Sequence, residues 1–332
     1  MIKPGLLILF PVLLSLSSCQ GQTSNSDKMK NETSNNPLIC DPAEGVCGIP
    51  GGEKGTKLSS QVTEKPIKII YFSDPVCSAC WGVEPTLRKL KSEYGNSVQI
   101  EYHMGGLLPS WEALGNGVNP SSLADRSDEM SKHFQMPMNG EVWKQDPPQS
   151  SYPPSIAFKA AQLQDEEKAV EFLRKIREGL YVRSINISKW ENIEKIAQGV
   201  GLDTKKLKKD YEASAQKAFD ADLKLAKEMG VRGFPCFFVT NSAGQSEIVY
   251  GIKPYTEFES ALKKMHSEVK KESYSKEWKT LFTQFNSLTT KEYADLSGIS
   301  FKEAETFLNG LTNKKEITKL ATRNGDLWSV EQ

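Results

Sequence analysis

The feature that most constrains this chain is a pair of cysteines, Cys77 and Cys80, with two residues between them. The pair follows an apolar run over residues 67–72, which is typical of a buried strand of β-branched and aromatic residues. A second strand is expected over residues 98–102. Between them lies a helical stripe that Gly95 is suited to cap, formed by Val83, Leu87, Leu90 and Tyr94. The two cysteines therefore belong to a strand-to-helix turn, with Cys77 at the start of the helix.

This position has chemical consequences for the two sulfurs. The unpaired backbone N–H groups and the dipole at a helix N-terminus stabilise a thiolate. Two sulfurs three positions apart can close a small ring by exchange with the disulfide of a partner. We predict that Cys77 is the exposed nucleophile and that Cys80, one turn deeper, is the resolving thiol. Pro85 falls inside the same expected helix, where proline costs about 3 kcal/mol relative to alanine, so a kink is expected.

The CxxC spacing is not unique to redox proteins, because zinc ribbons and structural disulfides also use it. A zinc site needs a second pair of ligands, and none of the three histidines is in CxxH spacing: His103, His133 and His266. A redox pair is therefore the favoured interpretation, and a zinc ligand pair or an inert disulfide are the alternatives. We expect no metal and no other cofactor.

The N-terminus predicts export. Lys3 precedes an apolar run over residues 5–16, which is too short for a comfortable membrane span and is typical of a secretory signal. Its ending, Leu-Ser-Ser-Cys, resembles a bacterial lipobox and predicts residues 1–19 as a lipoprotein signal peptide with Cys19 as the lipidated residue. An ordinary cleaved signal and an uncleaved anchor are the alternatives. We expect a lipid-anchored protein of the cell envelope that faces the periplasm.

Residues 20–65 are expected to form a flexible tether that carries a cysteine-containing loop. Cys40 and Cys47 end a short loop of glycine, proline and small residues, over which a disulfide closes easily. An oxidising envelope makes such a bond credible. A structural staple is the favoured interpretation, and a second redox pair that exchanges with Cys77–Cys80, or metal binding, are the alternatives.

The rest of the chain predicts one sheet with a helical insertion. Helical spacing dominates residues 154–230, and the insertion as a whole is expected at about 116–230. A turn then leads into a strand at 231–239, which a second strand at 247–250 pairs through a tight turn, before a helix at 255–269.

Residues 273–332 are expected to form a separate, small, mainly helical unit. The spacing over residues 290–311 resembles a helix-turn-helix, but its candidate recognition helix at 300–306 carries one lysine and two glutamates. Lys+Arg and Asp+Glu balance at 42 each over the whole chain. With no basic field to attract phosphates, we expect no nucleic acid partner and favour a packing or docking module.

Three features together resemble the DsbA-like branch of the thioredoxin superfamily: the CxxC turn, the helical insertion and the Gly-Phe-Pro turn that ends at Pro235. The resemblance implies an α/β, thioredoxin-like domain of DsbA type over residues 66–272. It also implies a cis Phe234–Pro235 bond beside the active-site disulfide, where the backbone pairs with substrate. Trp81 is a further candidate for this substrate groove, and the alternative is that it covers the helix start. Cys236 is expected to be a buried, inert thiol, with a redox role as the alternative.

A narrower group is similar over residues 151–161 and 172–176, namely the FrnE-type proteins and the cytosolic adaptors that deliver the regulator Spx to the ClpXP protease. Two departures matter. A lipobox would place this chain where no ClpXP works, so we do not carry over the adaptor role. Ser78-Ala79 also lacks the histidine that stabilises a thiolate in strongly oxidising relatives.

The favoured function is that of a thiol–disulfide oxidoreductase of the envelope, acting on exported proteins with cysteines and served by a redox recycling partner. A protein-binding, adaptor-like module on the same fold is the first alternative. A glutathione-using enzyme of the kappa type is the second, which the CxxC pair disfavours. Near the cysteines, Asp74 is expected to be a turn residue rather than a proton carrier, and Glu84 to lie on a solvated helix face rather than to act as a base.

Overall fold

The computed structural model describes residues 40–41, 45–48, 65–114 and 119–330, and every structural statement below refers to these residues. The predicted signal peptide, the lipidation of Cys19 and most of the predicted tether lie outside the described residues. Within the described part of the chain, every helix is too short or too polar to cross a membrane.

The centre of the fold is a four-stranded sheet in the order β4-β3-β6-β7. Its strands are β3 (Ile67–Ser73), β4 (Val98–Met104), β6 (Cys236–Asn241) and β7 (Ser246–Tyr250). β3 and β4 are parallel, whereas β6 is antiparallel to both β3 and β7. β3 is buried along almost its whole length, as its apolar sequence predicts for a central strand covered on both faces.

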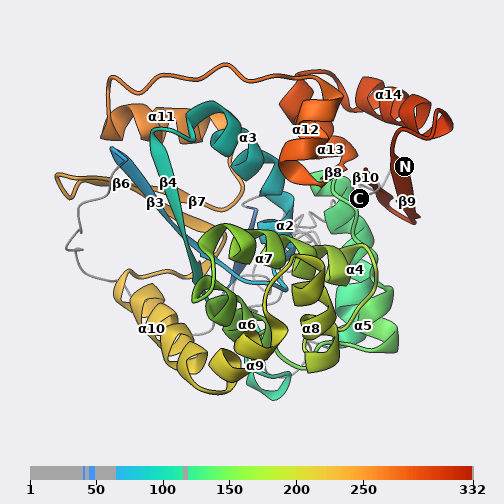
Figure 1. Ribbon diagram of the computed structural model, residues 1–332. Coiled ribbons are helices and arrows are strands. Elements are labelled where there is room, and N and C mark those ends of the chain that lie inside the picture. The colour runs from blue at the N-terminus through green and yellow to red at the C-terminus, as the bar shows by residue number, and fades with distance from the viewer. Residues whose placement is uncertain (1–39, 42–44, 49–64, 115–118, 331–332) are drawn as a thin grey trace, which may run out of the picture.

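Alternate side chains of β3 point into two different cores, as the two-residue period of a strand requires. Ile69 and Tyr71 pack with α3 (Glu84–Tyr94) and α11 (Tyr255–Met265), and Ile70 and Phe72 pack with the helices of the insertion. Figure 1 shows α3 and α11 on one side of the sheet and the insertion on the other. The α/β, thioredoxin-like fold class expected from the sequence is confirmed.

The predicted kink in the first helix is in fact a break between two helices. α2 (Ser78–Gly82) ends at Val83, and Pro85 lies in the first turn of α3. Proline is well tolerated there because the first N–H groups of a helix have no intrahelical acceptor. Gly95 is the C-cap of α3, as predicted.

The insertion lies between β4 and β5 (Gly233–Phe234), which agrees with the predicted position. It begins with the short 3₁₀ helix η1 (Glu112–Leu114). The α-helices that follow are α4 (Pro120–Phe134), α5 (Glu141–Gln145), α6 (Tyr152–Gln162), α7 (Glu166–Tyr181), α8 (Trp190–Gly199), α9 (Thr204–Glu212) and α10 (Ser214–Glu228).

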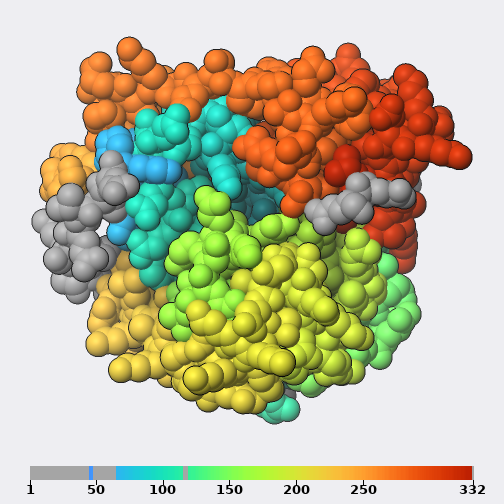
Figure 2. Space-filling view, in the orientation of Figure 1, coloured from blue at the N-terminus to red at the C-terminus, as the bar shows by residue number. Residues whose placement is uncertain are grey.

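The C-terminal unit has its own core around Trp328, which is fully buried. Its elements are α12 (Trp278–Phe285), β8 (Ser287–Thr289), α13 (Thr290–Ser297), α14 (Phe301–Asn313), β9 (Thr318–Thr322) and β10 (Gly325–Ser329), with the strands in the order β8-β10-β9. α13 and α14 match the predicted helix-turn-helix spacing, whereas the three strands were not predicted. The missed signal was the dipeptide Asn324-Gly325, which marks turns; the turn itself is formed by Arg323 and Asn324, and Gly325 begins β10. In Figure 2 this unit, orange to red, lies against the segments coloured teal and green.

A second, small sheet joins the N-terminal loop to the rest of the fold. β1 (Cys40–Asp41), β2 (Val46–Gly48) and β5 form an antiparallel sheet in the order β1-β2-β5. The sequence predicts a tethered loop here but not this pairing, because β5 lies far away in the chain.

Candidate functional site

Cys77 and Cys80 lie where the sequence places them, at the start of α2. Cys77 is the N-cap residue, and its Sγ accepts a hydrogen bond from the backbone N–H of Cys80 at 3.2 Å. Both cysteines are free thiols. The predicted exposure of Cys77 is wrong, however, because the residue is 0% exposed. The chain covers its own candidate nucleophile.

The Gly-Phe-Pro turn lies beside Cys77, as the resemblance implies. The Phe234–Pro235 peptide bond is cis, and Cys77 Sγ donates a weak hydrogen bond to the Phe234 carbonyl oxygen at 3.7 Å. The Phe234 ring fills a space that only glycine leaves open, because a Cβ on Gly105 would lie 1.6 Å from the Phe234 Cζ atom. Cys236 follows at the start of β6, and its burial raises the pKa of its thiol to about 12.

The cover over Cys77 is β2. Cys47 pairs with Phe234 in the strand register, and its Sγ atom lies 3.9 Å from Ser78 Oγ. Cys47 is disulfide-bonded and fully buried. Cys40 is its register partner in β1, although the Cys40 side chain lies outside the described residues. The loop that carries Cys47 therefore reaches the CxxC site. The sequence alone did not decide whether it would.

The two thiols of the site differ in their electrostatic surroundings. Burial raises the pKa of Cys77 well above its ordinary value, and the adjacent Cys80 sulfur raises it further. Burial would also raise the pKa of Cys80, but the hydrogen bond from Cys77 and the positive charge of Arg177 together hold it below its ordinary value. With β2 in place, negative charge is therefore favoured on Cys80, whereas the sequence predicted a thiolate at Cys77. The reason is that β2 removes water from Cys77 while Arg177 faces Cys80.

Arg177 on α7 is a site residue that the sequence analysis missed. Its guanidinium is fully buried and donates hydrogen bonds to Glu84 Oε1 and Ser73 Oγ. The expectation of a solvated Glu84 is wrong, since this residue is only 8% exposed and is ion-paired to Arg177. The available sequence signal for Arg177 was its position within the apolar stripe of a helix. Its partner, Glu84, could not be inferred because it lies on a distant segment of the chain.

Asp74 holds the turn before the cysteines, as expected. Its carboxylate accepts hydrogen bonds from the N–H groups of Val76 (2.9 Å) and Leu107 (2.7 Å) and from Ser151 Oγ (2.8 Å). Burial raises the pKa of Asp74 to about 6, although these hydrogen bonds oppose the shift. The group therefore titrates near neutral pH while it fixes the loop that carries Cys77.

Trp81 is fully buried beneath the start of α2 and does not line an open groove. Its indole N–H donates to the Pro137 carbonyl at 2.9 Å, its ring stacks on Tyr181, and the Arg174 guanidinium lies 4.3 Å from the ring centroid. These contacts match the alternative interpretation, in which Trp81 covers the helix start.

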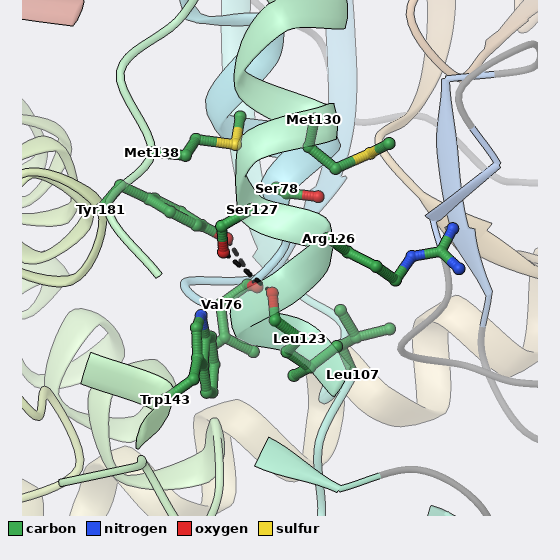
Figure 3. Close-up of a pocket in the computed structure, with 10 residues that line it drawn as sticks. All are labelled: Val76, Ser78, Leu107, Leu123, Arg126, Ser127, Met130, Met138, Trp143 and Tyr181. Atoms are coloured by element: carbon green, nitrogen blue, oxygen red, sulfur yellow. Dashed lines mark hydrogen bonds between the residues drawn. The ribbon is translucent and has the colours of Figure 1, made fainter. Parts of the chain in front are cut away.

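A small cavity of about 40 Å³ lies between the CxxC turn and α4. Figure 3 shows Met130, Met138, Trp143 and Tyr181 among the side chains in its walls, and Tyr181 O–H donates to the Val76 carbonyl at 2.7 Å. Ser78, between the two cysteines, is one of the lining residues. The space suits a small apolar group beside the CxxC turn, because its lining is mainly apolar.

Buried ion pairs connect the C-terminal unit to this site. Glu292 on α13 accepts two hydrogen bonds from Arg174 and pairs with Arg88 Nε at 3.1 Å. Arg174 also pairs with Glu178 at 2.9 Å, and Arg88 donates to the Ser287 carbonyl at 2.6 Å. Arg174 also covers Trp81 on α2, so these ion pairs connect the C-terminal unit to the helix that carries the CxxC pair.

Metal binding has no visible counterpart in the described residues, where no group of three or more His, Cys, Asp or Glu side chains is arranged to hold an ion.

Comparison with known proteins places these features in a family. A family model described as thioredoxin matches residues 71–260. The ClpXP adapter protein SpxH of Halalkalibacterium halodurans is 32% identical over 88% of this chain and 97% of its own length. SpxH of Bacillus subtilis is 32% identical over 80% of this chain and 89% of its own length.

Among solved structures, the cytosolic disulfide reductase DsbM from Pseudomonas aeruginosa is 17% identical, with a TM-score of 0.48, over 60% of this chain and 95% of that protein. The family model and the SpxH relatives decide the assignment. The chain belongs to the thioredoxin family, together with these SpxH relatives.

Proposed function

We propose that this protein is a thiol–disulfide oxidoreductase that acts through Cys77 and Cys80. One observation carries the proposal: two free thiols share a hydrogen-bonded helix start, and the first of them lies 3.7 Å from the carbonyl before Pro235. An inert structural pair would not need two free thiols beside β5, the strand that ends at Phe234. At the level of the superfamily, the fold is one that supports thiol–disulfide chemistry.

The proposed reaction is a pair of thiolate displacements. The Cys77 thiolate attacks one sulfur of a substrate disulfide, which forms a mixed disulfide and releases the other substrate sulfur as a thiolate. Cys80 then attacks Cys77 Sγ, which closes the Cys77–Cys80 disulfide and releases the second substrate sulfur. Two electrons pass to the substrate, and the reverse sequence oxidises a substrate dithiol. The positive charge of Arg177 lowers the pKa of Cys80 and so favours the thiolate form that attacks in this second step.

Access to Cys77 requires a movement of β2. Cys77 and Phe234 are both fully buried, and β2 occupies the edge of β5 along which a substrate backbone would pair. A substrate strand therefore has to replace β2 before it reaches the nucleophile.

We further propose, from the N-terminal lipobox alone, that Cys19 is lipidated and that the protein faces the periplasm. In this setting the substrates are exported proteins with cysteines, and a separate recycling partner restores the CxxC pair. The membrane is contacted through the lipid anchor only.

A second candidate function is a non-catalytic, adaptor-like binding module. The relatives favour it, since those that match most of the chain are named as ClpXP adapters rather than as enzymes. On this fold, the partly exposed apolar side chains of the C-terminal unit, Ile299 (38%) and Phe307 (41%), would contribute to a binding surface.

One experiment separates the two functions. A peptide disulfide is offered to the wild type, to Cys80→Ser and to the Cys77→Ser/Cys80→Ser double variant. An oxidoreductase turns the peptide over, and Cys80→Ser retains it as a mixed disulfide on Cys77. An adaptor shows neither, and its partner binding is unchanged in the double variant.

A further inference from the structure

β2 lies where the backbone of a substrate is expected to lie. It pairs antiparallel with β5, the two-residue strand that ends immediately before Pro235, and it places Cys47 opposite Phe234. A peptide bound for disulfide exchange needs its own cysteine at this position, because the Phe234 carbonyl lies 3.7 Å from Cys77 Sγ. The chain thus presents one of its own cysteines to its own CxxC site.

Two glycines, Gly45 and Gly233, allow the backbone of β2 to approach its neighbours closely. Gly45 has a φ of +65°, and its carbonyl accepts a hydrogen bond from Ile252 N–H at 3.0 Å. A Cβ at Gly45 would lie 2.7 Å from the Ile252 nitrogen, and a Cβ at Gly233 would lie 2.6 Å from the Cys47 carbonyl oxygen. The docking of β2 leaves no room for a Cβ at either position, and the positive φ of Gly45 favours glycine as well, so the sequence is suited to this docking.

The sulfur atoms are in complementary oxidation states. Cys47 is disulfide-bonded, whereas Cys77 and Cys80 are free thiols. Cys47 Sγ lies 3.9 Å from the hydroxyl of Ser78, the residue that follows Cys77. The disulfide-bonded Cys47 therefore lies beside the residue that follows the reduced Cys77, and exchange requires this kind of proximity.

We infer that the Cys47 disulfide, with Cys40 as its second cysteine, is the internal exchange partner of the Cys77–Cys80 pair. This inference rests on the proposed function, and it replaces the structural staple that the sequence favoured. A staple needs only the pairing of β1 with β2, whereas the pairing of β2 with β5 brings the disulfide to the nucleophile.

The exchange consists of two thiolate displacements. Cys77 passes its proton to the hydrogen-bonded Cys80 sulfur and attacks Cys47 Sγ, so that the Cys47–Cys77 bond forms and Cys40 leaves as a thiolate. Cys80 then attacks Cys77 Sγ, the Cys77–Cys80 bond forms, and Cys47 leaves as a thiolate. Two electrons move from the CxxC pair to the loop pair, and the two protons released at Cys77 and Cys80 are taken up at Cys40 and Cys47. A tethered partner reacts at an effective concentration in the mM range, so the internal step precedes an encounter with a dilute substrate.

The test traps the internal intermediate in the full chain. Cys80→Ser is equilibrated with oxidised glutathione, its thiols are blocked, and it is cleaved with trypsin. We expect the peptide of residues 31–54 to be linked to that of residues 69–88. The link should persist in Cys40→Ser/Cys80→Ser and be lost in Cys47→Ser/Cys80→Ser. An intact loop disulfide beside a free Cys77 thiol in Cys80→Ser would overturn the inference.

The same preparation separates this inference from the proposed function. If Cys77 captures an added peptide disulfide but never Cys47, the oxidoreductase stands and the internal partner is refuted. If the Cys47–Cys77 link forms but added peptides are never captured, the internal exchange stands and the proposed substrate class fails.

A second variant tests the docking without touching a cysteine. Gly45→Val should displace β2 and raise the rate at which a small thiol reagent labels Cys77 by about tenfold or more, since a buried thiol becomes exposed. Gly244→Val is the matched control, because Gly244 also has a positive φ but meets no atom within 4 Å of its added Cβ. Equal labelling rates for the two variants would contradict the role of β2 as the cover.

Discussion

Replacing Glu292 with glutamine tests how strongly the C-terminal unit is joined to the CxxC domain. The Glu292 carboxylate is fully buried between the guanidinium groups of Arg174 and Arg88. The substitution keeps the shape of the side chain but removes the charge, so that two buried cations lose a shared partner. Breaking a buried ion pair in this way costs about 3–5 kcal/mol. We expect a loss of that size in the free energy of unfolding.

The assay is urea unfolding followed by tryptophan fluorescence, since Trp81 and Trp328 report on the two sides of the junction. Glu303→Gln is the matched control. Glu292 and Glu303 both occupy the third position of a capping box, on α13 and α14, but Glu303 is exposed and has no buried cation beside it. The control should therefore change stability far less.

Acid gives an independent check of the same reasoning. Burial raises the pKa of Glu292, but Arg174 and Arg88 lower it to a net value below the ordinary one. The stabilisation is therefore present above the pKa of the unfolded chain and is lost as the pH falls through the lower pKa of the folded state. The difference between wild type and Glu292→Gln should shrink in acid. Equal losses in Glu292→Gln and Glu303→Gln at neutral pH would refute the account of the junction.

Three further predictions follow from the site. For Asp74, burial raises the pKa from 3.8 to about 6, a shift worth about 3 kcal/mol. The unfolded chain therefore loses this proton first, and between pH 3 and pH 7 the wild type should lose about 3 kcal/mol more unfolding free energy than Asp74→Asn. Parallel pH profiles would contradict the shift. Arg177→Met should raise the pKa of Cys80, because burial then dominates. The ultraviolet absorbance of the thiolate, followed against pH in a Cys77→Ser background, measures this pKa. An unchanged titration would show that Arg177 does not act on Cys80. Cys19→Ala should abolish labelling by a fatty-acid analogue and release the protein from membranes, and an unlabelled wild type would refute the anchor.

The sequence was most informative where neighbouring residues determine the structure. The CxxC turn, the Gly-Phe-Pro turn and the position of the insertion all follow from local patterns, and the structure contains each of them. The predicted exposure of Cys77 failed because the burial of this residue depends on β2, which lies thirty residues earlier in the chain and pairs with β5. Register between distant strands is not encoded in local periodicity.

The buried charges around the site were missed for the same reason. The sequence predicts Glu84 as a surface residue because its partner, Arg177, is 93 positions away. A buried guanidinium is acceptable only where carboxylates meet it, so its location depends on tertiary packing. The hairpin of β9 and β10, by contrast, had a local signal in Asn324-Gly325.

The central claim is that Cys77 and Cys80 act as one two-electron couple. The most direct test is to equilibrate the full chain with glutathione buffers of graded potential and to count blocked thiols on Cys77 and Cys80 by mass spectrometry. We predict that both sulfurs change together in a single two-electron transition, between about −270 and −120 mV, the range that thioredoxin-fold oxidoreductases cover. Thiols that stay reduced across all buffers, or that add glutathione independently of each other, would contradict the claim.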